Sequence, residues 1–251
     1  VGRVLAPLLH ARKQPVRAAL LSLPVAIIVG LVLWYSLFSG KTAENATLEL
    51  ALAKLEAHDL GEARRIASEV RTGKDASFAN VGGAFYVLGA VMAEDAKGHE
   101  NAGERQTLHL IASRYLEEAR IRGFPEGYEK EGLLLLGRSL HQGGRFQASI
   151  PILKEALSQN LSAKGEILYL LADAYLHLTP PNLEQASAQT RRLLAEKHLP
   201  QAERDRGLLL QAKVALAQGN YHDGQKALEK ISPKSIVHAE GMLLSVRLLC
   251  E

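Results

Sequence analysis

The sequence predicts an all-α protein in which a single N-terminal transmembrane helix is followed by an α-solenoid of antiparallel helix pairs. Three observations lead to this fold class. One apolar stretch near the N-terminus is long enough to cross a membrane. The rest of the chain is rich in helix-forming Ala, Leu, Glu, Gln and Arg and lacks the alternation of β-branched residues that is typical of strands. A set of small and apolar residues also returns at intervals close to the length of a helix-pair repeat.

The composition is that of a folded protein with an uneven distribution of charge. Hydrophobic residues make up 47% of the 251 positions and charged residues 23%, which is ordinary for a globular chain. Four basic residues and no acidic residue occupy positions 1–40: Arg3, Arg12, Lys13 and Arg17. Of the 30 basic and 27 acidic residues in the chain, 26 basic and all 27 acidic ones therefore lie in positions 41–251. Because this larger region has no excess of positive charge, we expect no nucleic-acid partner.

The first predicted element is a transmembrane helix over residues 18–38. Its sequence, AALLSLPVAIIVGLVLWYSLF, has 21 residues and no charge. At about 1.5 Å per residue such a helix spans roughly 31 Å, which matches a hydrocarbon core of about 30 Å. Trp34 and Tyr35 stand near one end, where aromatic residues anchor a span at the membrane interface. The apolar run continues through Phe38 without a signal-peptide cleavage site, so we expect an uncleaved anchor.

The charges on the two sides of the span predict its direction. The flank over residues 1–17 is basic, whereas the linker over 39–43 contains only Lys41, which Glu44 closely follows. The positive-inside rule therefore places the N-terminus in the cytoplasm and the rest of the chain outside it, with a bacterial inner membrane as the favoured setting. Two N-glycosylation sequons, the first at Asn45, leave a eukaryotic lumen as the alternative.

Residues 44–251 carry an internal repeat. Counting from Gly137, small, apolar or aromatic residues follow at offsets of 3, 7, 9, 12, 16 and 19: Leu140, Gly144, Phe146, Ser149, Leu153 and Ala156. The same offsets from Ala212 give a second set: Ala215, Gly219, Tyr221, Gly224, Leu228 and Ile231.

This pattern resembles the tetratricopeptide repeat. The resemblance implies two antiparallel helices in each unit, which interlock through small residues, and a turn marked by a glycine and an aromatic residue. Gly137 and Ser149 would allow the two helices to approach closely, because their side chains take little space. Gly144 would permit the turn, and Phe146 would pack back over it.

Less regular copies complete the array and begin at these anchors: Ala51, Gly89, Ala172 and, for a final half repeat, Ser245. In the first of them His58 stands where the pattern has a glycine. In the second, the polar residues 93–107 delay the second helix by eleven positions, which predicts a longer first helix followed by an exposed loop. We therefore expect about five irregular repeats plus a half repeat over 44–251, continuing beyond this chain.

The sequence contains no recognisable catalytic or metal-binding motif. The single cysteine, Cys250, can form neither an intrachain disulfide nor a Cys-based zinc site. The nine histidines are scattered, and none belongs to an H-E-x-x-H pair. A nucleophile elbow and a dinucleotide-binding fingerprint are also missing. We therefore expect no enzyme active site, no bound metal and no cofactor.

The resemblance also implies a binding surface, which is the concave groove formed by the first helix of each repeat. Eleven residues placed just before or just after the anchors are the candidates to line it: Tyr86, Glu131, Leu134, Arg138, His141, Glu166, Tyr169, Asp173, His177, Arg206 and Lys213. Both signs of charge and two tyrosines occur in this set, which suits an extended peptide or a partner helix. The alternative is a solvated helix face that binds nothing.

The predicted function is that of a membrane-tethered scaffold or adaptor that binds a protein or peptide partner. One alternative is a structural module that assembles into a homo-oligomer, helped by the small residues Ser22, Ala26 and Gly30 in the span. Another is the anchor and adaptor part of a larger enzyme whose catalytic domain lies outside this chain.

Overall fold

The computed structural model of the chain describes residues 47–73, 77–159 and 163–249, which belong to one compact unit. The predicted membrane span over 18–38 and both of its flanks lie outside the described residues. Among the helices that are described, none has the combination of length and apolar character that crossing a membrane requires.

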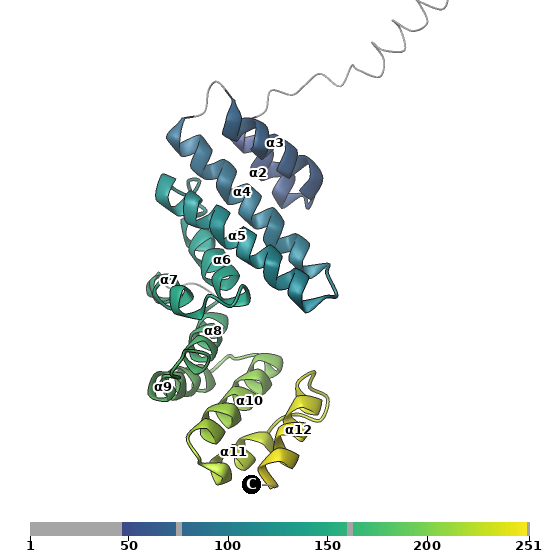
Figure 1. The fold of residues 1–251 in the computed structure, drawn as a ribbon, viewed down its shortest axis with the longest axis vertical. Helices are drawn as coiled ribbons and strands as arrows, with labels where there is room; N and C mark the ends of the chain where they lie inside the picture. Colours follow the sequence, from purple (N-terminus) through teal and green to yellow (C-terminus); the bar gives the residue numbers. More distant parts are fainter. Residues whose placement is uncertain (1–46, 74–76, 160–162, 250–251) are drawn as a thin grey trace, which may run out of the picture. The chain divides into compact units, whose positions relative to one another are not determined.

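Eleven α-helices and no strand make up the described part of the chain, and the helices pack in sequence as antiparallel pairs (Figure 1). The first helices of the pairs are α2 (Leu48–Glu56), α4 (Phe78–Lys97), α6 (Glu129–Gln142), α8 (Lys164–Leu176) and α10 (Gln201–Ala217). The second helices are α3 (Leu60–Thr72), α5 (Ala102–Arg122), α7 (Phe146–Ser158), α9 (Leu183–Leu194) and α11 (Tyr221–Leu228), and α12 (His238–Leu249) follows the last pair. The predicted all-helical class and the antiparallel pairing are confirmed.

The first helices form an inner row. Every helix packs against the next one along the chain, and α2, α4, α6, α8 and α10 also contact one another in that order. Within the described residues, the second helices have no comparable contact among themselves. Side chains on the first helices of neighbouring pairs therefore meet directly, and the inner row is where groups from different pairs can form one surface.

Small residues let the two helices of a pair approach closely, as the repeat pattern predicts. A Cβ atom at Gly137 in α6 would lie 2.6 Å from Leu153 Cδ2 in α7. In the preceding pair, a Cβ atom at Gly89 in α4 would lie 2.6 Å from Leu116 Cγ in α5. Both leucines are completely buried, so neither has room to move aside. The same glycine–leucine contact thus holds both pairs together.

The turn between the helices of a pair uses a left-handed residue at the predicted position. Gly144 and Gly219 lie seven residues after their anchors and have φ angles of 77° and 74°. His58 occupies the same place in the first pair and has a φ angle of 56°. Because a side chain disfavours this conformation, His58 adopts it at a cost that glycine avoids.

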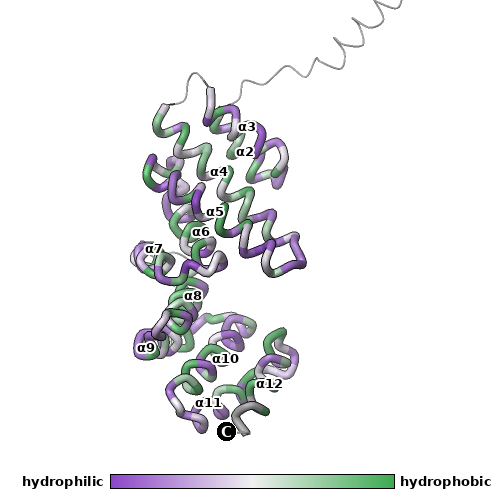
Figure 2. Tube along the Cα trace, in the orientation of Figure 1, coloured by the Kyte–Doolittle hydropathy of each residue, from purple (hydrophilic) through white to green (hydrophobic). Residues whose placement is uncertain are grey.

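The pair α4/α5 follows the prediction made for residues 93–107 in part. The first helix is longer than in the other pairs, as expected, but the exposed loop is only four residues long. Residues 98–101 alone connect the helices, and the remaining polar residues extend α4 and α5. Asn101 ends the connection by accepting hydrogen bonds from the amides of Gly103 and Glu104, at 2.8 and 3.3 Å, and so caps α5. The polar sequence therefore marks a hydrophilic helical tip (Figure 2).

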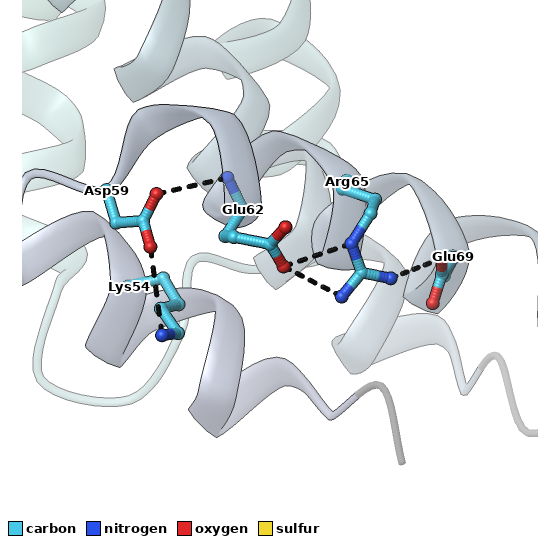
Figure 3. Close-up of polar contacts among 5 residues, drawn as sticks. All are labelled: Lys54, Asp59, Glu62, Arg65 and Glu69. Carbon is cyan, nitrogen blue, oxygen red and sulfur yellow. Dashed lines mark hydrogen bonds and ion pairs between the residues drawn. The ribbon is translucent and has the colours of Figure 1, made fainter. Parts of the chain in front are cut away.

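The exposed face of α3 carries a network of short-range polar contacts (Figure 3). Asp59 caps this helix by accepting from the Glu62 amide at 3.4 Å and lies 3.7 Å from the Lys54 ammonium group. Arg65 donates to Glu62 at 2.9 and 3.0 Å and to Glu69 at 2.6 Å. Exposed pairs of this kind each contribute at most about 1 kcal/mol, so they support the helix and keep its outer face soluble.

Candidate partner-binding groove

All eleven residues predicted to line a groove lie on the inner row. Tyr86 is in α4, four of them are in α6, three are in α8, His177 is the C-cap of α8, and the last two are in α10. The structure divides all of them except Lys213 among two hollows and a polar junction between the hollows. We call these the acidic hollow, the central junction and the C-terminal hollow.

The acidic hollow lies between α2, α4 and α6 and has a volume of about 290 Å³. Four predicted residues line it: Tyr86, Glu131, Leu134 and Arg138. The sequence analysis missed the other residues of its wall: Leu55, Glu56, His58, Ala90, Glu94, Tyr128 and Leu135. A signal for two of them was present, because Glu56 and Glu94 both follow their anchors by five residues, as the predicted His177 follows Ala172.

Two tyrosines form the aromatic part of the acidic hollow. The Tyr86 side chain is 2% exposed, and its ring centroid lies 5.3 Å from that of Tyr128. Burial raises the pKa of Tyr86, and the charge of Glu131 raises it further. The Tyr128 hydroxyl donates a hydrogen bond to the carboxylate of Glu56, which raises the pKa of Tyr128 to about 12. Both hydroxyls therefore stay protonated and can act as donors at neutral pH.

The central junction joins α6 to α8 through two sets of polar contacts. Arg138 donates to both carboxylate oxygens of Glu166, from Nε at 2.6 Å and from Nη2 at 2.8 Å. Deeper in the junction, His141 Nε2 lies 2.9 Å from Asp173 Oδ2, and His177 Nδ1 lies 3.3 Å from the same oxygen. A bidentate arginine–carboxylate pair fixes both position and orientation, so these contacts hold the two helices in register.

Asp173 is the centre of the buried part of this junction. Its side chain is 14% exposed and that of His141 is 8% exposed. Burial alone would raise the pKa of Asp173, but the hydrogen bond from His141 and the charges of His141, His177 and Lys213 lower it below its ordinary value. The carboxylate therefore remains ionised. With so little surface open to a partner, these groups serve mainly to join the helices.

The aromatic ring of Phe146 covers the histidines of the central junction. It stacks on His177 with the ring centroids 4.8 Å apart, and its centroid lies 5.2 Å from that of His141 in an edge-on arrangement. Phe146 is the aromatic residue of the turn in the repeat pattern. Phe146 is the first residue of α7. The second helix of the pair α6/α7 therefore covers the contact between α6 and α8.

The C-terminal hollow lies between α8, α9 and α10 and has a volume of about 240 Å³. Glu166, Tyr169 and Arg206 of the predicted set line it, together with Glu203. Burial raises the pKa of Tyr169 to about 12, an effect that Asp173 reinforces and Arg206 opposes. Arg206 forms no ion pair with any described residue and is exposed. This hollow therefore presents charges of both signs beside a tyrosine.

Lys213, the last predicted residue, lies outside both hollows. Its Nζ lies 2.6 Å from Glu240 Oε1, so it links α10 to α12. This ion pair resembles that of Arg138 and Glu166, because Lys213 also stands one residue after its anchor and pairs with a glutamate beyond its own helix pair.

Two other features bear on where a ligand could bind. No group of three or more metal-ligating side chains occurs among the residues that the structure describes. On the other side of the inner row, an open depression of about 800 Å³ lies over α5, α6 and α7. Compared with known proteins, the sequence matches no protein-family model and no curated protein.

Proposed function

We propose that this protein is a membrane-tethered scaffold of tetratricopeptide-like repeats, which binds an extended segment of a protein partner along its inner row. The observation that carries the proposal is the convergence of side chains from equivalent repeat positions. Tyr86 and Tyr169 each precede their anchors by three residues and each lines one of two separate hollows on this row.

The character of the two hollows supports a peptide as the ligand. Each has a volume near 300 Å³ or less, at the lower limit for small-molecule sites, which suits a single side chain. Each also combines a tyrosine, buried in the acidic hollow and half-buried in the C-terminal hollow, with charged groups, and such aromatic and charged anchors dominate peptide recognition. A peptide that runs along the inner row would place different side chains in the two hollows.

The membrane tether is the second part of the proposal and rests on the apolar residues 18–38 with their basic N-terminal flank. It places the repeats outside the cytoplasm. Protease added to spheroplasts should then cut the exposed connection at residues 98–101 between α4 and α5. Cleavage that occurs only after the spheroplasts are lysed would reverse the orientation.

Peptide selection tests the binding function. Peptides from a random library are selected on the full chain, and their affinities are then measured with variants. The double variant Tyr169→Ala, Arg206→Ala should weaken a groove-binding peptide by about tenfold or more. The control is Arg120→Ala, Glu155→Ala, which removes the 2.7 Å ion pair between α5 and α7 and should leave binding unchanged. Equal capture by wild type and by the Tyr169 and Arg206 variant would refute the groove assignment.

Self-association is a second candidate function, and the surface of α12 favours it. Met242, Leu243 and Val246 are 57%, 74% and 58% exposed and lie on one helix. Exposed apolar residues that cluster in this way mark surfaces that associate. Light scattering of the full chain over a range of concentrations should then give a mass above that of the monomer, and Leu243→Glu should lower it. A monomer at every concentration would exclude this candidate.

A further inference from the structure

We propose that the acidic hollow is the binding site for one basic side chain, an arginine for preference, of an extended partner peptide. The inference rests on the proposed function and adds the chemistry of the ligand. Three observations carry it: the absence of an arginine at the position equivalent to Arg138, the excess of carboxylates around the hollow, and the hydroxyl of Tyr86.

The junction of α4 and α6 lacks the arginine that the central junction has at the equivalent position. At the central junction Arg138, one residue after its anchor Gly137, pairs with Glu166, six residues before the next anchor. At the junction of α4 and α6, Glu131 stands six residues before Gly137 and so corresponds to Glu166. The position that corresponds to Arg138 is Ala90, and both Ala90 and Glu131 line the acidic hollow. The hollow thus lies where an arginine side chain would be needed to complete the pattern.

The acidic hollow also contains more negative charge than its own residues neutralise. Three carboxylates line it and Arg138 is its one lining Lys or Arg residue, with a guanidinium group already paired with Glu166. Glu56 accepts from Tyr128, and Glu94 pairs with Lys97 at 2.6 Å on the exposed face of α4. Glu131 has no hydrogen bond or ion pair with any described residue. The electrostatic potential of this site therefore favours a cation.

Tyr86 provides the observation that is independent of the carboxylates. Its side chain is 98% buried, given the exposed fraction of 2%, and its hydroxyl makes no hydrogen bond with any described residue. The hydroxyl is not one of the fully enclosed polar atoms that lack a partner, so it opens onto the hollow that Tyr86 lines together with Glu56 and Glu131. Its oxygen can therefore accept a hydrogen bond from a guanidinium group that enters the hollow.

The remaining wall suits the long side chain of arginine. Leu134 and Leu135 offer apolar surface to the methylene groups. The rings of Tyr86 and Tyr128 stand beside the carboxylates, and aromatic rings attract a guanidinium group. Arginine is preferred to lysine because its planar group forms two parallel hydrogen bonds with a carboxylate, as Arg138 does with Glu166.

The experiment compares three labelled peptides on the full chain by fluorescence anisotropy. Each peptide has seven residues, blocked ends and alanine at every position except the centre, which is arginine, lysine or uncharged citrulline. We expect the arginine peptide to bind about tenfold or more tightly than the citrulline peptide. Glu131→Gln should remove that preference. The control Glu184→Gln, which removes an exposed carboxylate of α9 outside both hollows, should preserve it.

A second variant protects the test against a simple loss of folding. Ala90→Arg puts into the chain the side chain that the ligand would supply, so it should prevent the arginine peptide from binding while the helix content stays unchanged. Equal affinity for the arginine and citrulline peptides, or an arginine preference that survives both Ala90→Arg and Glu131→Gln, would overturn the inference.

The outcomes also separate this inference from the proposed function. Library peptides that depend on Tyr169 and Arg206 but show no arginine preference would overturn the arginine site alone. If neither those peptides nor the arginine peptide respond to any substitution on the inner row, both proposals fail.

Discussion

The junction of α4 with α6 and the junction of α6 with α8 are built from equivalent positions of neighbouring repeats, yet one is open and the other is closed. In the closed junction, Arg138 and Glu166 form a bidentate pair above the buried contact of His141 with Asp173. In the open junction Ala90 replaces the arginine, and a hollow of about 290 Å³ remains beside the carboxylates.

The difference shows that the backbone of the repeat and the surface of the groove are determined separately. The contact of Gly89 with Leu116 and that of Gly137 with Leu153 are nearly identical, so both pairs are assembled in the same way. At these two junctions the side chain one residue after the anchor differs, and only the arginine can form an ion pair with the carboxylate of the next pair. A row of helix pairs can therefore open or close a hollow between neighbouring first helices through a single substitution, with the pair packing unchanged.

The largest effect is expected from breaking the closed junction. Asp173→Ala leaves the imidazole of His141 buried without the hydrogen bond that it now shares over 2.9 Å. We expect the free energy of unfolding to fall by about 2–3 kcal/mol, because an unsatisfied buried polar group costs about that much. Urea denaturation followed by circular dichroism measures the change.

The control for this prediction lies in the open junction. Glu131 is exposed and has no partner among the described residues, so Glu131→Ala should change the free energy of unfolding by less than about 0.5 kcal/mol. Equal losses for the two variants would show that the junctions do not differ in the way their contacts suggest.

The left-handed turns within the helix pairs should not share the difference between the two junctions. Their response to substitution should depend only on whether the turn residue is a glycine. Gly144→Ala and Gly219→Ala place a side chain on residues with φ angles of 77° and 74°, and each should destabilise the protein by about 1–2 kcal/mol. His58→Gly should have the opposite sign, with a gain of about 0.5–1 kcal/mol, since it relieves the same strain. Thermal denaturation of the three variants gives the comparison. A loss of stability for His58→Gly would contradict it and would show that the His58 side chain makes a stabilising contact.

Acid should remove the special stability of the closed junction. Because the pKa of Asp173 is lowered in the folded state, its carboxylate stabilises the protein above the unfolded-state pKa of about 3.9, and this contribution is lost as the pH falls through the lowered folded-state pKa. Asp173→Asn should therefore be less stable than the wild type at pH 7, and the difference should shrink below about pH 4. For Gly144→Ala, which changes no charge, the loss should stay the same over this range. A difference for Asp173→Asn that does not depend on pH would contradict the assignment.

Much of the fold could be predicted because the repeat is a local pattern. The anchor Gly137 and its partner Leu153 lie within one helix pair, so their spacing in the sequence is enough to predict the contact between them. The prediction for residues 93–107 was right about the longer first helix but overestimated the exposed loop, because polar composition does not by itself indicate irregular structure. Most of these residues lie in α4 and α5, and only residues 98–101 form the exposed connection.

The groove residues could be predicted less completely than the fold. The repeat offsets place Tyr86 and Arg138 on the inner row, but Tyr128 lies before the start of α6 and follows no offset. Whether a junction is open or closed depends on two residues from different repeats, separated by 28 positions for Arg138 and Glu166. Because the repeats differ in length, this separation differs from one junction to the next. The paired residues can therefore be identified from the structure but not from the sequence spacing alone. The membrane span lies outside the described residues and stays a prediction.

Opening the closed junction on purpose should change the stability only a little. The side chains of Arg138 and Glu166 are 32% and 35% exposed, so Arg138→Ala should lower the free energy of unfolding by less than about 1 kcal/mol. Its effect on binding should be larger. Glu166 would then stand free beside an alanine, as Glu131 does now, and the arginine peptide should find a second site. Titration calorimetry should show the stoichiometry rising from one to two, whereas Arg138→Lys, which keeps a cation, should leave it at one. A single unchanged site in Arg138→Ala would mean that the absence of an arginine is not what opens a junction, and Ala90 would then not explain the acidic hollow.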